Sequence, residues 1–266
     1  MKNIILPVNI SELKSVAILA AKAAGSELAK RFVTFKRADI KSKSAHEILT
    51  AADLASEKLI IKAIKHNFPE HQILSEEAGD NDKKSDYLWI IDPLDGTTNF
   101  SMHNPLFSVS IALAYKGEIV LGVVYAPITN EIYEAVLGRG AKLNGRRLKV
   151  SSFKNGKLIN AYCHSSKPED ITRAIAYYSK QKANGFDCRQ MGSAAIELAY
   201  VAAGRIESIA IPGANSWDVG AGVLLVKEAG GRITDFNNKA WSLKSYDMLA
   251  SNGLVHKNLI SVWKGI

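Results

Sequence analysis

The spacing of hydrophobic and polar residues predicts two kinds of structure in the first half of the chain. Residues 11–32 are rich in alanine and lack proline, and residues 53–67 repeat apolar side chains at helical spacing until Pro69 ends the pattern. The pattern then changes to short apolar or alternating runs, at residues 87–91, 107–115, 119–125 and 131–136. Asn144-Gly145 is typical of a hairpin turn, because both residues tolerate a positive φ. We therefore expect two helices followed by a largely antiparallel sheet.

Strands and helices alternate in the second half. We expect strands at residues 159–163 and 208–211, and another that ends near residue 191. Helical patterns cover residues 168–182, 193–204 and 217–229, and glycines close the last two. This alternation predicts a layered α/β arrangement. Because the pattern changes near residue 150, we divide the chain into halves, 1–150 and 151–266, that form one compact functional unit.

Composition places the chain among soluble globular proteins. The 266 residues are 47% hydrophobic and 23% charged, which suits a large buried core. Two cysteines cannot build a disulfide framework, and the start of the chain lacks the features of a secretory signal, so we expect a reduced, cytoplasmic protein. No apolar run reaches the roughly 18 residues that a membrane span needs. We expect no membrane association.

The net charge of +8 does not by itself predict binding of nucleic acid. The lysines are scattered, and the densest basic segments, residues 41–43 and 146–149, contain no interleaved aromatic side chains. The pattern favours a solvated basic surface, which also raises the local concentration of an anionic substrate.

Residues 89–100 carry the most informative chemistry. An apolar strand is expected to end at Asp92, Pro93 then fixes the backbone, and Asp95-Gly96 turns into a helix start. Two carboxylates would thus be held at one strand end beside free N–H groups. This arrangement suits a hard cation and a phosphate together.

Two further acids occur in similar surroundings. Glu76 follows a second short apolar stretch, and Asp218 opens the helix near residue 217. Taken alone, the string around Asp92 fits a surface turn, and an aspartate in a first helical turn has an ordinary helix-dipole explanation. Their occurrence together favours a shared site.

These segments, in this order and with these neighbours, resemble the inositol monophosphatase family of magnesium-dependent, lithium-sensitive phosphatases. The resemblance covers residues 49–252. It implies an α-β-α-β-α sandwich like that of fructose 1,6-bisphosphatase, with the metal site between an antiparallel first half and a mixed second half. It also implies a homodimer.

The resemblance also implies roles for individual residues. Two or three Mg²⁺ ions would be bound by Glu76, Asp92, Asp95, Asp218 and the main-chain oxygen of Leu94. Thr97 would orient the attacking water, and Asp53 and Glu76 would assist as catalytic residues. Substrate contacts would come from Leu94, Asp95, Gly96, Thr97, Gly192, Ser193, Ala194 and Asp218. The metal-activated water would attack phosphorus in line, without a phosphoenzyme.

Two positions depart from the family pattern. Ile211 occupies the place of a glutamate that contacts the polyol hydroxyls in animal members, and an aliphatic side chain cannot accept a hydrogen bond. The loop at residues 41–47 has an altered spacing, which puts a third metal in question. We therefore expect the phosphate-cleaving residues to be intact, but not strict selectivity for inositol phosphate.

Several functions stay open at this point. The leading hypothesis is hydrolysis of a sugar or polyol phosphate monoester, with inositol 1-phosphate as first choice. Fructose 1,6-bisphosphate is the main alternative substrate, and 3′-phosphoadenosine 5′-phosphate and histidinol phosphate follow. A hypothesis of another class is a protein of this fold that binds RNA or a protein partner.

Overall fold

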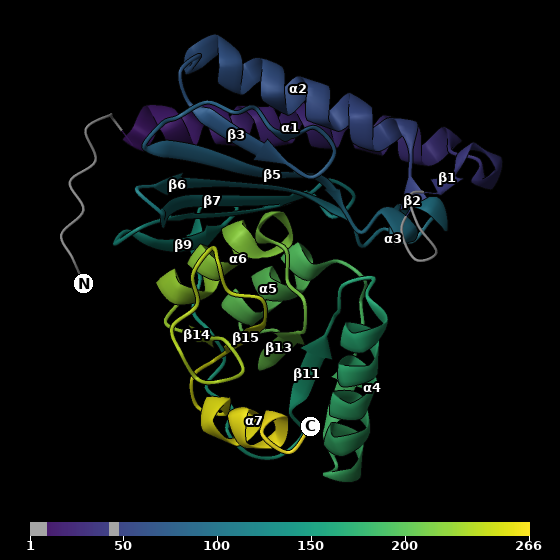
Figure 1. Cartoon of the computed structure of the whole chain (residues 1–266), viewed down its shortest axis with the longest axis vertical. Helices are drawn as coiled ribbons and strands as arrows, with labels where there is room; N and C mark the ends of the chain where they lie inside the picture. Colours follow the sequence, from purple (N-terminus) through teal and green to yellow (C-terminus); the bar gives the residue numbers. More distant parts are fainter. Residues whose placement is uncertain (1–9, 43–47) are drawn as a thin grey trace.

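The computed structural model describes residues 10–42 and 48–266, and most of the altered loop at residues 41–47 lies outside these ranges. Its helices are α1 (Ile10–Thr34), α2 (Ala51–Asn67), α3 (Thr97–Ser101), α4 (Pro168–Ala183), α5 (Ala194–Ala202), α6 (Ser216–Glu228) and α7 (His256–Trp263), with a 3-10 turn at Arg37–Asp39. Figure 1 shows α1 and α2 above a large sheet, α5 and α6 below it, then a smaller sheet, and α4 and α7 outermost. The layered α-β-α-β-α sandwich is confirmed.

The larger sheet has eight strands in the order β10-β9-β8-β7-β6-β5-β3-β4. Their bounds are β3 (Gln72–Ser75), β4 (Gly79–Asp80), β5 (Tyr87–Asp95), β6 (Ser108–Tyr115), β7 (Glu118–Ala126), β8 (Glu131–Val136), β9 (Gly140–Leu143) and β10 (Arg146–Arg147). Only β3 and β5 pair in parallel, so the sheet is largely antiparallel, as predicted. The expected turn at Asn144-Gly145 joins β9 and β10, and both residues have positive φ.

The smaller sheet is mixed. It contains β11 (Ile159–Tyr162), β12 (Asp187–Arg189), β13 (Ser208–Ile211), β14 (Arg232–Thr234) and β15 (Met248–Ser251), in the order β12-β11-β13-β15-β14. β11 runs parallel to β12 and β13, whereas β15 is antiparallel to β13 and β14. β1 (Lys41–Ser42) and β2 (Ile48–Leu49) form a separate two-stranded ribbon. The division of the chain near residue 150 stays a prediction.

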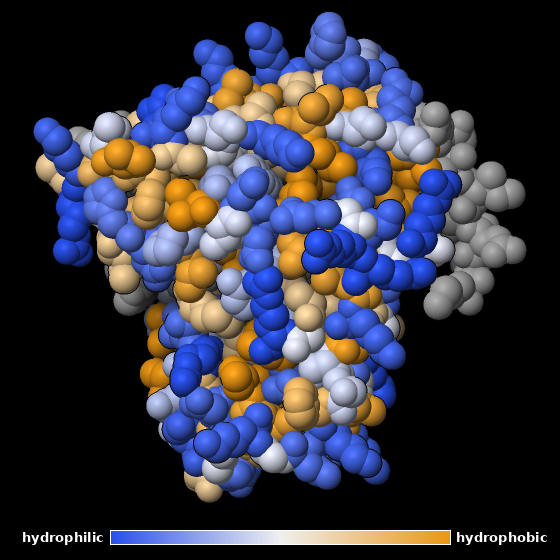
Figure 2. Space-filling model, turned by 180° about the vertical axis from the view of Figure 1, so that it is seen from behind, coloured by the Kyte–Doolittle hydropathy of each residue, from blue (hydrophilic) through white to orange (hydrophobic). Residues whose placement is uncertain are grey.

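No helix in the described part of the chain is long and apolar enough to cross a membrane. Cys163 and Cys188 are free thiols. On the face seen in Figure 2, hydrophilic side chains are interspersed with smaller apolar groups.

A row of small residues lets α6 approach the large sheet closely. Ala112, Gly122 and Ala135 are cross-strand neighbours on β6, β7 and β8. A Cβ atom on Gly122 would come within 2.6 Å of the carbonyl oxygen of Ala221 in α6. Because larger side chains would push the helix away, this row sets how far α6 stands from the sheet.

We predict that Gly122→Ala lowers the free energy of unfolding by about 1–3 kcal/mol, because the new methyl group meets backbone atoms that cannot rotate away. The matched control is Gly220→Ala in α6, where the nearest atom to a new Cβ is the Cβ of Ala112 at 3.2 Å. Alanine also favours a helix interior over glycine, so this control should stay within about 1 kcal/mol of wild type. Urea unfolding of the three proteins measures both effects, and equal stability of Gly122→Ala and wild type would contradict the packing argument.

Candidate active site

Strand β5 carries Asp92 and Asp95, which are only 2% and 7% exposed. The strand does not end at Asp92, as the sequence predicted, but continues to Asp95 with an irregular pairing to β6 between the two residues. Asp92 Oδ1 accepts a hydrogen bond from the N–H of Leu94 at 3.0 Å. Pro93, which has no N–H, therefore interrupts the ladder at a local bulge without ending the strand.

Asp95 joins the two halves of the chain. Its carboxylate accepts hydrogen bonds from the hydroxyl of Ser193 and from the N–H groups of Ala194 at 3.1 Å and Ala195 at 2.9 Å. These donors open α5, as the sequence predicted for a helix start at Ser193, and the helix dipole favours a negative charge there. Burial raises the pKa of Asp95 to about 6, although these hydrogen bonds lower it.

Glu76 and Asp218 come from two other elements. Glu76 directly follows β3, and its N–H donates to the carbonyl of Ile91 in the parallel strand β5 at 3.1 Å. Asp218 lies in the first turn of α6, where the side-chain amide of Asn215 donates to its Oδ2 at 3.1 Å. Parallel strands end at the same edge of a sheet, so Glu76 lies at the same end of the sheet as the acids of β5.

Negative charges of neighbouring acids raise the pKa of two members of the group, Asp92 and Asp218. Burial raises the pKa of Asp92 well above its ordinary value, and the negative charges of Glu76, Asp95 and Asp218 raise it further. Burial, followed by the charges of Asp95 and Glu76, also raises the pKa of Asp218. Among the described residues, no lysine or arginine forms an ion pair with Asp92, Asp95 or Asp218. The fold thus gathers the acids that the sequence singled out and leaves three of them without a described cationic partner.

The chemistry of these donors fits a hard divalent cation. Carboxylate and carbonyl oxygens are the ligands that magnesium prefers in proteins, and a divalent charge would relieve the repulsion among the acids. Within residues 10–42 and 48–266, no three acid, histidine or cysteine side chains meet closely enough to hold one ion in their present rotamers. A magnesium ion in a protein is commonly held by one or two carboxylates together with other oxygen ligands and water, so a smaller set of these acids would suffice.

Asp53 and Thr97 are brought together although 44 residues separate them. The hydroxyl of Thr97 lies 3.1 Å from Asp53 Oδ1 and 3.0 Å from the carbonyl oxygen of Leu94. Asp53 Oδ2 accepts from the N–H and the hydroxyl of Thr50 at 2.8 and 2.7 Å, which completes a capping box at the start of α2. Burial raises the pKa of Asp53, and these hydrogen bonds lower it. The same carboxylate thus caps a helix and positions Thr97.

Gly96 allows a close approach between the two halves. It has a φ of +91°, and a Cβ there would lie 3.1 Å from the carbonyl oxygen of Gly192. Asn99, which the sequence reading missed, donates from its amide to the carbonyls of Leu106 at 2.6 Å and Met191 at 2.7 Å. The loop before α5 is therefore tied to the residues that follow Asp95.

Glu197 is a second residue that the sequence reading missed. It is fully buried in α5, and its Oε1 accepts from the N–H groups of Met191 at 2.7 Å and Gly192 at 3.0 Å. Burial raises its pKa to about 8. The signal was present in the sequence, because Glu197 is the one charged residue in the apolar segment Ala194–Ala202.

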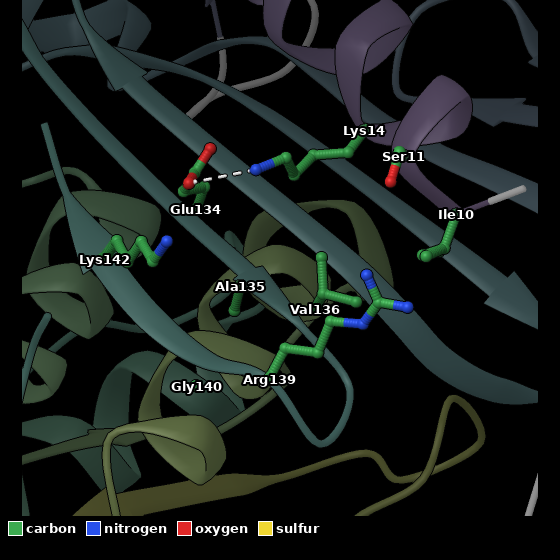
Figure 3. A pocket seen from close by; sticks show the side chains of 9 residues that line it. All are labelled: Ile10, Ser11, Lys14, Glu134, Ala135, Val136, Arg139, Gly140 and Lys142. Atoms are coloured by element: carbon green, nitrogen blue, oxygen red, sulfur yellow. Dashed lines mark hydrogen bonds and ion pairs between the residues drawn. The ribbon is translucent and has the colours of Figure 1, made fainter. Parts of the chain in front are cut away.

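A hollow of about 170 Å³ on the large sheet is not part of this site. Figure 3 shows Lys14 reaching from α1 toward Glu134 on β8, with their charged atoms 3.2 Å apart. The neighbouring N–H of Gly140 donates to Glu228 at the end of α6. Ten residues of helix, about 15 Å, separate Glu228 from Asp218, so the hollow and the acids lie at opposite ends of α6.

We predict that the metal-free protein loses stability as the pH rises from about 4 through about 6 and beyond. An acid whose pKa is raised in the folded chain keeps its proton there, whereas the unfolded chain loses it, so a rising pH favours unfolding. For Asp95 alone, a rise from 3.8 to about 6 corresponds to on the order of 3 kcal/mol. Urea unfolding in the presence of a chelator over this pH range measures the effect.

Asp92→Asn removes one of the repelling charges and should flatten this pH dependence, with a gain in stability at neutral pH. Asn keeps an oxygen that can accept from the N–H of Leu94. The control is Asp86→Asn at an exposed position near Lys116, which should leave the pH dependence unchanged. A wild-type stability that rises from pH 4 to 8 would show that the repulsion is unimportant.

Comparison with known proteins points to one family. The sequence pattern of the inositol monophosphatase family matches residues 9–264. The protein named Nus factor SuhB of Pasteurella multocida is 39% identical over 257 residues, which cover 95% of this chain and 96% of the relative. The protein of the same name in Escherichia coli K12 is 38% identical over 250 residues, 93% of this chain and 94% of the relative.

Solved structures similar to this chain include members of the same family. The inositol monophosphatase of Anabaena has a TM-score of 0.85 at 34% identity, covering 97% of this chain and 98% of the other. The extragenic suppressor protein suhB of Bartonella henselae has a TM-score of 0.89 at 32% identity, covering 96% and 100%. The chain therefore belongs to the inositol monophosphatase family.

Proposed function

We propose that this protein hydrolyses phosphate monoesters of small sugars or polyols in a reaction that depends on Mg²⁺. The observation that carries the proposal is the gathering of Glu76, Asp92, Asp95 and Asp218 from three segments into one cluster, in which the neighbouring negative charges raise the pKa of Asp92 and of Asp218. A fold maintains such a repulsion at a cost in stability, which suits a cluster whose charge is balanced by a bound cation. Inositol 1-phosphate is the first substrate to test, and fructose 1,6-bisphosphate is the second.

The four acids and the carbonyl of Leu94 would hold the cations. When bound, magnesium supplies positive charge to the phosphate oxygens and lowers the pKa of a water molecule. Asp95 Oδ1 accepts one described hydrogen bond, from Ala194, which leaves a lone pair for a cation. Glu76 would help to position the water as well as a metal ion.

Thr97 and Asp53 would orient the attacking water. The Thr97 hydroxyl has one hydrogen, which it donates toward Asp53 or Leu94, so its lone pairs are available to accept a hydrogen bond from water. Asp53 is held by Thr50 and is 1% exposed, so its position is fixed before substrate binds. These residues act by positioning the water, and the reaction needs no protein nucleophile.

The leaving group would lie near Gly192, Ser193 and Ala194. Ser193 and Ala194 already donate to Asp95, so they would contact a substrate mainly through other atoms. Ile211 is 2% exposed and packs in the apolar core between the sheets, so it offers no acceptor for a polyol hydroxyl. This supports a broad choice of leaving groups over strict selectivity for inositol.

We predict that Mg²⁺ is required for release of phosphate from inositol 1-phosphate, and that Asp92→Asn abolishes it. Thr97→Val should lower kcat by about 100-fold or more, since it removes the group that orients water.

Mg²⁺ at about 100 times its dissociation constant should stabilise wild type by about 2.7 kcal/mol, and Asp92→Asn should lose most of this gain. Phosphate assays and thermal unfolding, each with Mg²⁺ or chelator, measure both effects.

Asp86→Asn, a surface change of the same kind, should keep full activity. Comparing the rates with inositol 1-phosphate and fructose 1,6-bisphosphate decides between the two substrates. Activity that survives both chelation and Asp92→Asn would refute the metal mechanism. Magnesium binding without cleavage of either compound would point to another phosphate ester, for which 3′-phosphoadenosine 5′-phosphate and histidinol phosphate come next.

A second candidate function is binding of RNA or of a protein partner. It is favoured by the relatives named Nus factor SuhB and by the net charge of +8. If phosphate contacts from lysine and arginine hold RNA, log K should fall linearly with log salt, with a slope near −0.7 per contact on single strands. Fluorescence titrations at several salt concentrations measure this slope, and a slope near zero would remove RNA from consideration.

A further inference from the structure

A cavity in the second half combines apolar walls with a polar floor. It has a volume of about 230 Å³ and lies between β11, α4 and α7. Its apolar lining includes Leu158, Leu259 and Phe186, and its buried polar lining consists of Asn160 and Gln181, which are 1% and 0% exposed. Figure 1 places α4 and α7 on the outer side of the smaller sheet, away from α5 and α6. The cavity is therefore separate from the acid cluster.

Both amides occupy positions where the pattern calls for an apolar residue. Along β11, Ile159 and Ala161 pack with the core between the two sheets, so the alternation of a strand turns Asn160 toward the outer helices. In α4, Gln181 continues the buried stripe of Ala174 and Tyr177 at helical spacing. Two elements thus each place an amide at the same buried location.

These amides have unused hydrogen-bonding groups in the described structure. Asn160 Oδ1 accepts from the hydroxyl of Ser208 at 2.7 Å, but Asn160 Nδ2 has no partner. Both Gln181 Nε2 and Gln181 Oε1 also lack one. The hydroxyl of Tyr177 lies close enough to Gln181 for hydrogen bonding to lower its pKa, and this contact can satisfy at most one of the two Gln181 amide atoms. Buried polar atoms are nearly always paired, so the two or three amide atoms that stay unpaired around one cavity indicate a missing partner.

Water alone is a poor partner for this cavity. A buried water needs two to four polar neighbours, and a space of this size would hold several waters. The unpaired atoms belong to two residues, and the remaining lining is mostly apolar apart from Lys154, Asn155 and Asn258. An apolar body with a hydrogen-bonding edge matches both parts of the lining.

We propose that this pocket binds a small, neutral, planar cyclic amide, with the hydrogen-bonding pattern of a single-ring nucleobase such as uracil. The Gln181 amide presents a donor beside an acceptor, which complements the N–H and C=O edge of a ring lactam. Asn160 Nδ2 adds a donor for a second carbonyl. Leu158, Leu259 and Phe186 would pack against the ring, and the volume lies below the roughly 300 Å³ at which drug-sized sites begin.

The test compares uracil with 1,3-dimethyluracil, which keeps the ring but has no N–H donor. Calorimetric titration or ligand-observed NMR of the full chain should show saturable binding of uracil and at least about tenfold weaker binding of the dimethyl compound. Asn160→Leu and Gln181→Met keep the side-chain size but remove the polar atoms, and each should weaken uracil binding by at least about tenfold. Asn67→Leu, the same change at the exposed end of α2, is the control and should have no effect.

Thermal unfolding and phosphatase activity show whether the variants fold, since neither Asn160 nor Gln181 belongs to the proposed catalytic site. A crystal soaked with uracil should show the ring beside Phe186 with its amide edge on Gln181. Only water in the cavity, equal binding of the two compounds, or unchanged binding by both variants would each overturn the proposal. If the variants do not fold, the wild-type comparison and the soaked crystal decide it.

Discussion

The carboxylate of Asp95 is the point on which the arrangement of the site depends. It sits at the end of a strand in the first half and accepts hydrogen bonds from residues 98 to 100 positions later, at the start of α5. Charge-assisted bonds of this kind are stronger than neutral ones, and they offset part of the penalty of burying the acid. The same residue therefore fixes α5 against β5 and contributes charge to the acid cluster.

The approach of α6 to the sheet is the second constraint. Asp218 joins the other acids because α6 lies close over Ala112, Gly122 and Ala135, and a helix held farther away would leave it short of the cluster. Glu76 arrives by a different route, through the parallel pairing of β3 with β5. Close packing of α6 on the large sheet therefore affects the acid cluster as well as the stability of the fold. It sets the distance between Asp218 and the other acids, and so the strength of their electrostatic repulsion.

Periodicity predicted the main elements well, and the resemblance to a family supplied their arrangement. Helices α1, α2, α4, α5 and α6 and most central strands have nearly the expected bounds, because each has a strong apolar repeat. The short elements β4, β14, β15 and α7 were not anticipated, since a few residues show no clear period. The extension of β5 past Asp92 was missed because Pro93 normally marks a strand end, and here a bulge absorbs it. The pairings of Asp95 with Ser193 and of Asn99 with Met191 join distant segments, which no local pattern reveals.

Polar residues inside apolar helix stripes have different roles, and the hydrogen-bond partners of each side chain show which role it has. Asp53 in α2 accepts hydrogen bonds from Thr50 and Thr97, and Glu197 in α5 accepts them from two backbone N–H groups. Both carboxylates therefore fix neighbouring segments of the chain. Gln181 in α4 breaks its stripe in the same way, but both of its polar atoms lack a partner in the described structure. A purely structural polar side chain would be expected to find partners for at least part of its polar group, because an unpaired buried group destabilises the fold. Glu197 does so through Oε1, although its Oε2 has no described partner. This difference in hydrogen bonding between Gln181 and the other two residues is the physical reason to propose a ligand in the pocket between β11, α4 and α7. That pocket is distinct from the proposed metal site between the sheets.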